Sequence, residues 1–65
     1  MKREYLIKKR KELGYLQDDV AKEAGIGRAA YCRIELGERE PSVKVAKRIG
    51  KLLDMDWTLL FKEIV

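Results

Sequence analysis

Residues 17–36 read QDDVAKEAGIGRAAYCRIEL and contain two short helical patterns. Apolar and small residues recur in both at the spacing of an α-helix. They are Val20, Ala21 and Ala24 in the first pattern, then Ala30, Tyr31 and Ile34 in the second. Gly25-Ile26-Gly27 interrupts the two, and Gly25 can adopt the left-handed conformation that ends a helix. Two helices joined by a short turn containing glycine form a helix-turn-helix.

The outer face of the second helix is the part of this motif that suggests a function. If the helix runs over about residues 28–36, its period keeps Tyr31 and Ile34 inward. The outer face then carries two cations and two small side chains, namely Arg28, Ala29, Cys32 and Arg33. The major groove of B-DNA admits an α-helix, and this face can enter it without steric conflict. For Cys32 we weigh a redox switch against a passive small side chain, and we favour the passive side chain.

A set of residues within and around this motif carries a family resemblance. They are Gln17, Val20, Ala21, Gly25, Ile26, Ile34, Glu35, Gly37, Pro41 and Ser42. The pattern resembles the helix-turn-helix domain of lambdoid phage repressors and Cro, the Xre-type regulators, from about Leu6 to Leu60. The family often has Ser or Thr where this chain has Leu16 and Gly27, and usually an aliphatic residue at Tyr31. The resemblance implies an all-α, five-helix, lambda-repressor-like DNA-binding domain.

Composition limits the possible functions. The 65 residues predict a single domain over 1–65, near the lower size limit for a self-sufficient core. The net charge of +4 makes an anionic partner plausible. The sequence has no apolar run of transmembrane length and no signal peptide, so we expect no membrane association. Its one cysteine excludes an internal disulfide and suits the cytoplasm. Without histidine, we expect no catalysis, no metal and no cofactor.

Residues 2–13 predict a first helix in which Leu6, Arg10 and Leu13 share one face. Arg10 interrupts this apolar stripe, so its charge needs a partner. Glu35, one turn beyond Tyr31, is the natural candidate for an ion pair, and the family resemblance implies the same pair. The other cations of this helix are assigned to a solvated basic surface, and they are Lys2, Arg3, Lys8, Lys9 and Lys11.

Two further helices are predicted after the motif. Val43–Leu53 forms one, with Ser42 able to cap it. Asp56 is a good N-cap for another, which runs from Trp57 to about residue 64 and brings Trp57 and Leu60 into the core. The apolar residues Phe61, Ile64 and Val65 have little left to bury them. Fraying into solvent is one interpretation and a dimer interface is the other.

These observations predict a sequence-specific, double-stranded DNA-binding transcriptional regulator. We expect a repressor that binds a near-palindromic operator as a homodimer through helix 28–36. The residues assigned to base contacts are Arg28, Ala29, Arg33 and Cys32. Those assigned to phosphate contacts are Gln17, Gly27 through its N–H, Arg39 and Lys9.

Other function classes remain open at this stage. The same fold serves as the antitoxin of a toxin–antitoxin pair, which binds DNA and also a partner protein. A protein-interaction module would instead use the outer face of helix 28–36 to dock a polypeptide, but the cations Arg28 and Arg33 favour nucleic acid. An enzyme is the least favoured class, because the sequence shows no acid–base pair.

Overall fold

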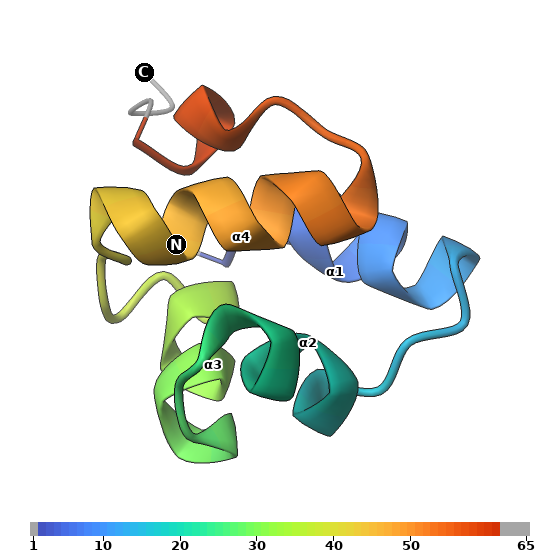
Figure 1. The fold of residues 1–65 in the computed structure, drawn as a ribbon, viewed down its shortest axis with the longest axis horizontal. Coiled ribbons are helices and arrows are strands. Elements are labelled where there is room, and N and C mark those ends of the chain that lie inside the picture. The colour runs from blue at the N-terminus through green and yellow to red at the C-terminus, as the bar shows by residue number, and fades with distance from the viewer. Residues whose placement is uncertain (1, 62–65) are drawn as a thin grey trace.

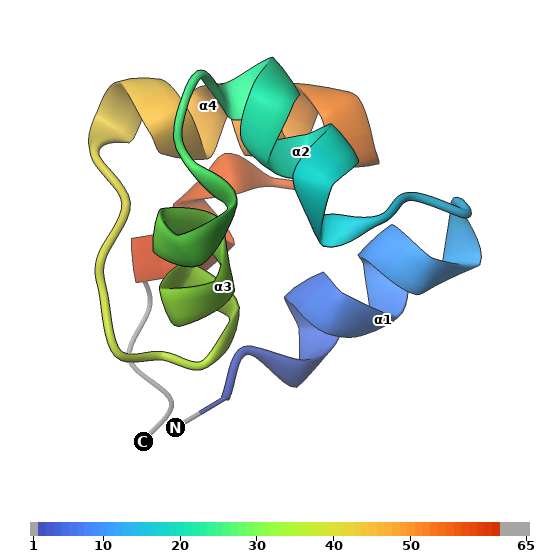
Figure 2. The same ribbon diagram turned by 90° about the horizontal axis from the view of Figure 1, so that it is seen from below.

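The computed structural model describes residues 2–61, which form four α-helices followed by a short 3-10 helix (Figure 1). The elements are α1 (Glu4–Glu12), α2 (Gln17–Ala24), α3 (Arg28–Glu35), α4 (Val43–Leu53) and the 3-10 helix η1 (Trp57–Phe61). In Figure 2, α4 lies along the top and α1 toward the bottom, and α3 and η1 lie between them. None of the described helices is long and apolar enough to span a bilayer.

The predicted all-α class is confirmed, but the expected fifth α-helix is not. The last described element is a 3-10 helix, in which the Leu59 N–H donates to the Asp56 carbonyl three residues earlier at 3.1 Å. The Asp56 side chain caps this element, because its Oδ1 accepts from the Thr58 N–H at 3.0 Å and from the Thr58 hydroxyl at 2.7 Å. Residues 62–64, which the sequence assigned to the same helix, lie outside the described residues.

One apolar core connects all five elements. Its buried members are Leu6, Val20, Ala21, Ala24, Tyr31, Ile34, Ala46, Ile49, Leu53 and Leu60. Tyr31 is the largest side chain that is fully buried. The small residues Ala21 and Ala24 allow α2 to pack closely against its neighbours. Each helix therefore places one face in the core, as the apolar spacing predicts.

The corner between α2 and α3 depends on backbone geometry rather than on side-chain caps. Gly25 has a φ of 75°, and the next N–H, that of Ile26, donates to the Ala21 carbonyl at 3.0 Å. Arg48 of α4 supports the same corner by donating to the Ala24 carbonyl at 3.3 Å. At the start of α3, Gly27 is in an extended conformation without a side-chain cap. The departure from the family pattern at Gly27 therefore leaves the helix start in place.

The start of α2 is stabilised by one of its own acidic residues. The Leu16 N–H donates to Asp19 Oδ2 at 2.8 Å, so a side chain in the first turn of α2 satisfies the backbone donor of the residue that precedes the helix. Asp19 also places negative charge in the first turn, where the helix dipole favours it.

One predicted core position is wrong. Leu13 is 45% exposed, because α1 ends at Glu12 and the chain turns at Gly14, whose φ is 78°. The turn is closed by the Tyr15 N–H, which donates to the Arg10 carbonyl at 3.0 Å. The apolar stripe of α1 would include Leu13 only if the helix continued beyond this turn.

A close backbone contact joins α4 to the segment that follows it. A Cβ added at Gly50 would lie 2.8 Å from Trp57 Cβ and 2.9 Å from the Met55 carbonyl oxygen. The Met55 N–H also donates to the Gly50 carbonyl at 3.0 Å. Gly50 therefore lets the chain return directly across α4 and place η1 on the core.

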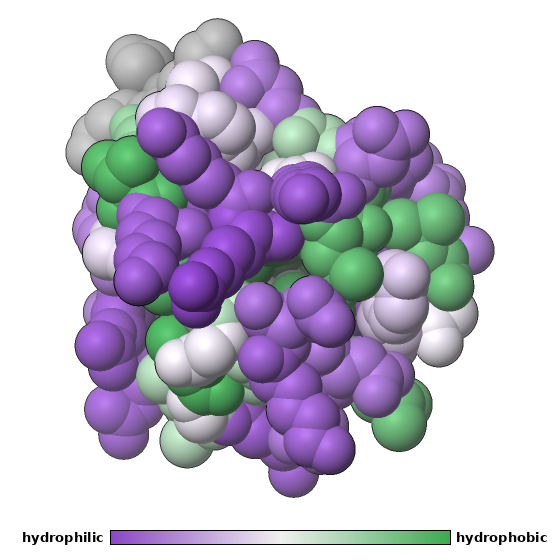
Figure 3. Space-filling model, in the orientation of Figure 1, coloured by the Kyte–Doolittle hydropathy of each residue, from purple (hydrophilic) through white to green (hydrophobic). Residues whose placement is uncertain are grey.

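The exposed surface of α4 is strongly basic. The helix has four exposed cations, Lys44, Lys47, Arg48 and Lys51, and no acidic residue. Figure 3 shows hydrophilic side chains across the middle of the face on which α4 lies, with hydrophobic patches beside them. Positive charge is thus spread over the molecule, and net charge alone does not identify a binding face.

Candidate nucleic-acid interface

The helix α3 presents its predicted outer face to solvent. Arg28, Ala29 and Arg33 are exposed and Cys32 is half-buried, whereas Tyr31, Ile34 and Glu35 on the opposite side are buried. This division follows from the helical period, which brings residues three or four positions apart onto the same face. The outer face therefore consists of two guanidinium groups with small side chains between them.

The start of α2 lies beside this outer face. One open depression of about 560 Å³ is lined by Arg10, Leu16, Gln17, Asp18 and Arg28. A second, of about 350 Å³, is lined by Gln17, Arg28, Ala29 and Cys32. Gln17 and Arg28 belong to both, so the first residues of α2 and α3 share one concave surface. We call the surface formed by Gln17, Arg28, Ala29, Cys32 and Arg33 the groove face.

The other predicted phosphate contacts come from outside these depressions. Gly27 is exposed at the start of α3, where backbone N–H groups and the helix dipole favour an anion. Arg39 is exposed in the α3–α4 loop, and Lys9 is half-buried on α1. Leu16 is a further residue at the rim, with 68% of its surface exposed. The sequence identified Leu16 only as a departure from the family pattern and did not assign it to the surface.

A buried ion pair lies beneath the groove face. Arg10 Nε donates to Glu35 Oε2 at 2.6 Å, and its Nη2 donates to Glu35 Oε1 at 3.3 Å. Arg10 is 8% exposed and Glu35 is 2% exposed. The third guanidinium nitrogen donates to the Tyr15 carbonyl at 2.9 Å, so Arg10 also holds the α1–α2 connection. Sequence reasoning placed this pair between α1 and α3, and the structure contains it there.

The groove face is linked to this ion pair through Gln17. Its Nε2 donates to Glu35 Oε1 at 2.9 Å, which fixes the orientation of the amide at the start of α2. Burial alone would raise the pKa of Glu35, but the hydrogen bonds from Arg10 and Gln17 are among the interactions that hold it below its ordinary value. The hydrogen bond to Glu35 likewise raises the pKa of Arg10. Both pKa shifts favour the charged forms of Arg10 and Glu35.

The hydroxyl of Tyr31 is buried beside the same pair. Burial raises the pKa of Tyr31, and interaction with Glu35 raises it further, so the phenol stays protonated. Within residues 2–61, no group meets the geometry of a hydrogen bond to this hydroxyl. An aliphatic residue, usual for the family at this position, would place no polar atom there.

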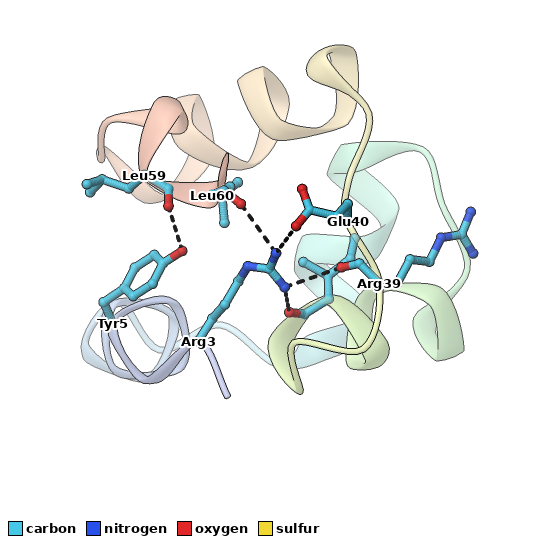
Figure 4. A network of polar contacts seen from close by, with 7 residues as sticks. Arg3, Tyr5, Arg39, Glu40, Leu59 and Leu60 are labelled. Atoms are coloured by element: carbon cyan, nitrogen blue, oxygen red, sulfur yellow. Dashed lines mark hydrogen bonds and ion pairs between the residues drawn. The ribbon is translucent and has the colours of Figure 1, made fainter. Parts of the chain in front are cut away.

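Arg3 was assigned to the solvated basic surface of the first helix, and this assignment is wrong. Its side chain is 12% exposed and points into the molecule (Figure 4). It donates to the carbonyl groups of Ile34, Arg39 and Leu60 and forms an ion pair with Glu40. The residues that accept these bonds are distant in sequence, so the apolar pattern of the first helix could not identify Arg3 as buried.

Of the predicted dimer residues, only Phe61 belongs to the described part of the chain. Phe61 is 36% exposed at the end of η1, and its ring contacts Trp57 edge-on, with centroids 6.1 Å apart. The Lys47 ammonium lies over the other aromatic ring, 5.3 Å from the Trp57 centroid. Ile64 and Val65 lie outside the described residues. The dimer interface therefore stays a prediction.

Within residues 2–61, no cluster of three or more His, Cys, Asp or Glu side chains could hold a metal ion. The groove face presents cationic and amide hydrogen-bond donors beside small side chains. This combination suits a nucleic acid, which has anionic phosphates and polar base edges.

Comparisons with known proteins agree with this geometry. A helix-turn-helix family model matches residues 6–60. The chain is 52% identical over 64 residues to the uncharacterized HTH-type transcriptional regulator YqaF of Bacillus subtilis, covering 98% of this chain and 84% of YqaF. It is 41% identical over 59 residues to the uncharacterized HTH-type transcriptional regulator YqaE of the same organism, covering 91% of this chain and 51% of YqaE.

A solved structure shares the arrangement of the helices. The N-terminal DNA binding domain of SinR from Bacillus subtilis is similar with a TM-score of 0.76 and 26% sequence identity. The match covers 92% of this chain and 88% of that chain. The likeness therefore concerns nearly the whole fold, and residues 6–60 of the family match include the entire groove face.

Proposed function

The chain belongs to the helix-turn-helix family of Xre/Cro-like regulators, and on that premise we propose that it is a sequence-specific transcriptional regulator that binds double-stranded DNA. We further propose that it acts as a repressor at a near-palindromic operator. The observation that carries the proposal is the outer face of α3, where Arg28 and Arg33 are exposed beside Ala29 and Cys32. This surface places two cations next to side chains small enough for close approach to base pairs.

Arg28 is the residue best suited to read a base. It is the first residue of α3 and lines both depressions of the groove face. A guanidinium group can donate two hydrogen bonds to O6 and N7 of one guanine, which is the commonest specific contact. Ala29, Cys32 and Arg33 complete the reading surface. The proposed phosphate contacts are Gln17, the Gly27 N–H, Arg39 and Lys9. Contacts to phosphates position the protein on the duplex but do not read the base sequence directly.

Replacing Arg28 with alanine should weaken binding to the best site by about 1–3 kcal/mol, most of it as lost discrimination at one base pair. Lys9→Ala should instead weaken all sequences to a similar degree and lower the slope of log K against log salt by about one unit. Both effects are measured as affinities for the best site obtained by site selection and for scrambled DNA, each at several salt concentrations. Lys51→Ala, on the exposed face of α4, is the control for loss of charge alone.

The base-reading assignment has a clear contrary outcome. If Arg28→Ala lowered the affinities for selected and scrambled DNA equally, Arg28 would be a phosphate contact. If the wild-type protein showed no preference among duplex sequences at any salt concentration, the proposal of a sequence-specific regulator would itself fail.

The second proposal concerns assembly on DNA. If Phe61, Ile64 and Val65 pair across a two-fold axis, two α3 helices can meet successive major grooves about 34 Å apart. The operator would then contain half-sites about 10 base pairs apart between their centres. Site selection followed by footprinting gives the symmetry of the site, and sedimentation gives the oligomeric state.

A matched pair of variants tests the role of Phe61 in this pairing. Phe61→Glu should weaken the dimer, because it places a charge in an apolar contact. Leu59→Glu is the control, since Leu59 is similarly exposed at 37% in the same element but is not assigned to the interface. A wild-type monomer that protects one unsymmetrical half-site would exclude the dimeric arrangement.

A further inference from the structure

Arg3 connects three parts of the molecule that are far apart in sequence. Its Nη1 donates to the Ile34 carbonyl at 2.6 Å and to the Arg39 carbonyl at 3.2 Å. Its Nη2 donates to the Leu60 carbonyl at 3.3 Å and lies 3.5 Å from Glu40 Oε1. One guanidinium group thus contacts the end of α3, the α3–α4 loop and η1 (Figure 4).

The contacts at the end of α3 satisfy backbone groups that the helix leaves open. The last carbonyls of an α-helix have no partner within the helix. The Arg3 N–H donates to the Glu35 carbonyl at 2.8 Å, while the guanidinium reaches the Ile34 carbonyl. A positive group at a helix C-terminus is also favoured by the helix dipole. Arg3 therefore acts as a cap for α3, supplied from the other end of the chain.

The same group holds the loop that carries Arg39. Arg3 binds the Arg39 carbonyl and the Glu40 carboxylate, whereas the Arg39 side chain extends away from this network (Figure 4). Pro41 is buried, but a small cavity of about 80 Å³ is lined by Ile26, Ala30, Ile34, Arg39, Glu40, Pro41, Ser42 and Val45. Arg3 therefore adds polar contacts to a loop whose side chains leave a small space beside α3.

We propose that Arg3 is a positioning residue for DNA binding, which fixes the loop of Arg39 relative to the reading helix α3. Arg3 does not contact DNA in this proposal, because its donors are directed into the molecule. The inference rests on the proposed function through the role of Arg39 as a phosphate contact. Its first consequence, an ordered loop, concerns the free protein and can be measured without DNA.

The first experiment measures amide hydrogen exchange in the free protein. The Gly37 N–H donates to the Ile34 carbonyl at 3.1 Å and the Glu38 N–H to the Arg33 carbonyl at 2.9 Å, so both report on the junction of α3 with the loop. In Arg3→Ala, their exchange should accelerate about tenfold more than that of the α4 amides. Lys2→Ala, which removes an exposed neighbouring cation, should leave the ratio unchanged. Equal acceleration of all amides in Arg3→Ala would overturn the proposal.

The second experiment is a double-mutant cycle in DNA binding. Arg39→Ala should lower the salt slope by about one unit, and Arg3→Ala should lower it by a similar amount although Arg3 faces inward. The double variant should lower the slope no further, because Arg39 is already displaced. Lys2→Ala is again the control for charge. Additive slope changes in the double variant would overturn the proposal.

Failure of the inference and failure of the proposed function give different results. A wild-type protein that binds no duplex DNA would end the proposed function, while the exchange ratio would still decide whether Arg3 holds the loop. If Arg3→Ala does not fold, Arg3→Lys replaces it in both experiments. Lysine keeps the charge but lacks the planar set of donors that reaches separate acceptors, so the same local acceleration is expected.

Discussion

Replacing Arg10 with alanine should lower the free energy of unfolding by about 3–5 kcal/mol, because it leaves a buried carboxylate without its cation. Glu35 is 2% exposed and receives two of its hydrogen bonds from Arg10. The remaining bond from Gln17 is neutral and cannot balance the charge. The substitution also removes the donor to the Tyr15 carbonyl, which holds the α1–α2 connection. Chemical denaturation at neutral pH measures the loss.

The control for this substitution is its neighbour Lys11, which is exposed on the same helix. Lys11→Ala should change the free energy of unfolding by no more than about 0.5 kcal/mol, as is usual for surface positions. A loss below about 1 kcal/mol in Arg10→Ala, the range of solvent-exposed pairs, would show that Arg10 and Glu35 are hydrated rather than buried together.

Replacing Leu60 with alanine should cost about 2–5 kcal/mol, because the substitution leaves a cavity where η1 completes the core. Leu60 is 1% exposed, and its carbonyl also accepts a hydrogen bond from Arg3. The adjacent Leu59 is 37% exposed, although Tyr5 donates to its carbonyl at 3.0 Å. Both carbonyls remain in the alanine variants, so the two substitutions differ mainly in the apolar side chain that is removed from the core.

Thermal or chemical denaturation of the two variants tests the place of η1 in the fold. Leu59→Ala should cost less than about 1 kcal/mol, since little apolar surface is lost from the interior. Similar losses in the two variants would mean that η1 does not pack on the core with one defined face.

Several features could be predicted because neighbouring residues encode them. The boundaries of α4 follow from Ser42, whose Oγ accepts from the Val45 N–H at 3.1 Å, and from the apolar run that ends at Leu53. The helix-turn-helix corner follows from Gly25, which adopts the left-handed conformation that its lack of a Cβ permits. Arg10 was identified as needing a partner because it interrupts an apolar stripe. The division of α3 into the groove face and a buried face likewise follows from the helical period.

Other features could not be predicted, because their causes lie elsewhere in the chain. The sequence around Arg3 is as basic as that around the exposed Lys2 and Lys8, and only the position of its acceptors separates Arg3 from them. Leu13 has the spacing of a core residue but lies beyond the end of α1. The segment after Asp56 begins like a helix, yet its described part is a 3-10 helix.

The sequence by itself determined the four α-helices, the corner of the motif and the side chains of the groove face, because periodicity, glycine conformation and caps act over a few residues. Tertiary structure decided which cation is buried, where the apolar stripe of α1 ends and how η1 meets α4. These outcomes depend on the carbonyls that Arg3 can reach and on the approach of Trp57 to Gly50, which are contacts between residues distant in sequence. The burial of Arg3 depends on the carbonyl groups that the folded chain places around it, and the residues next to Arg3 in the sequence do not indicate those partners.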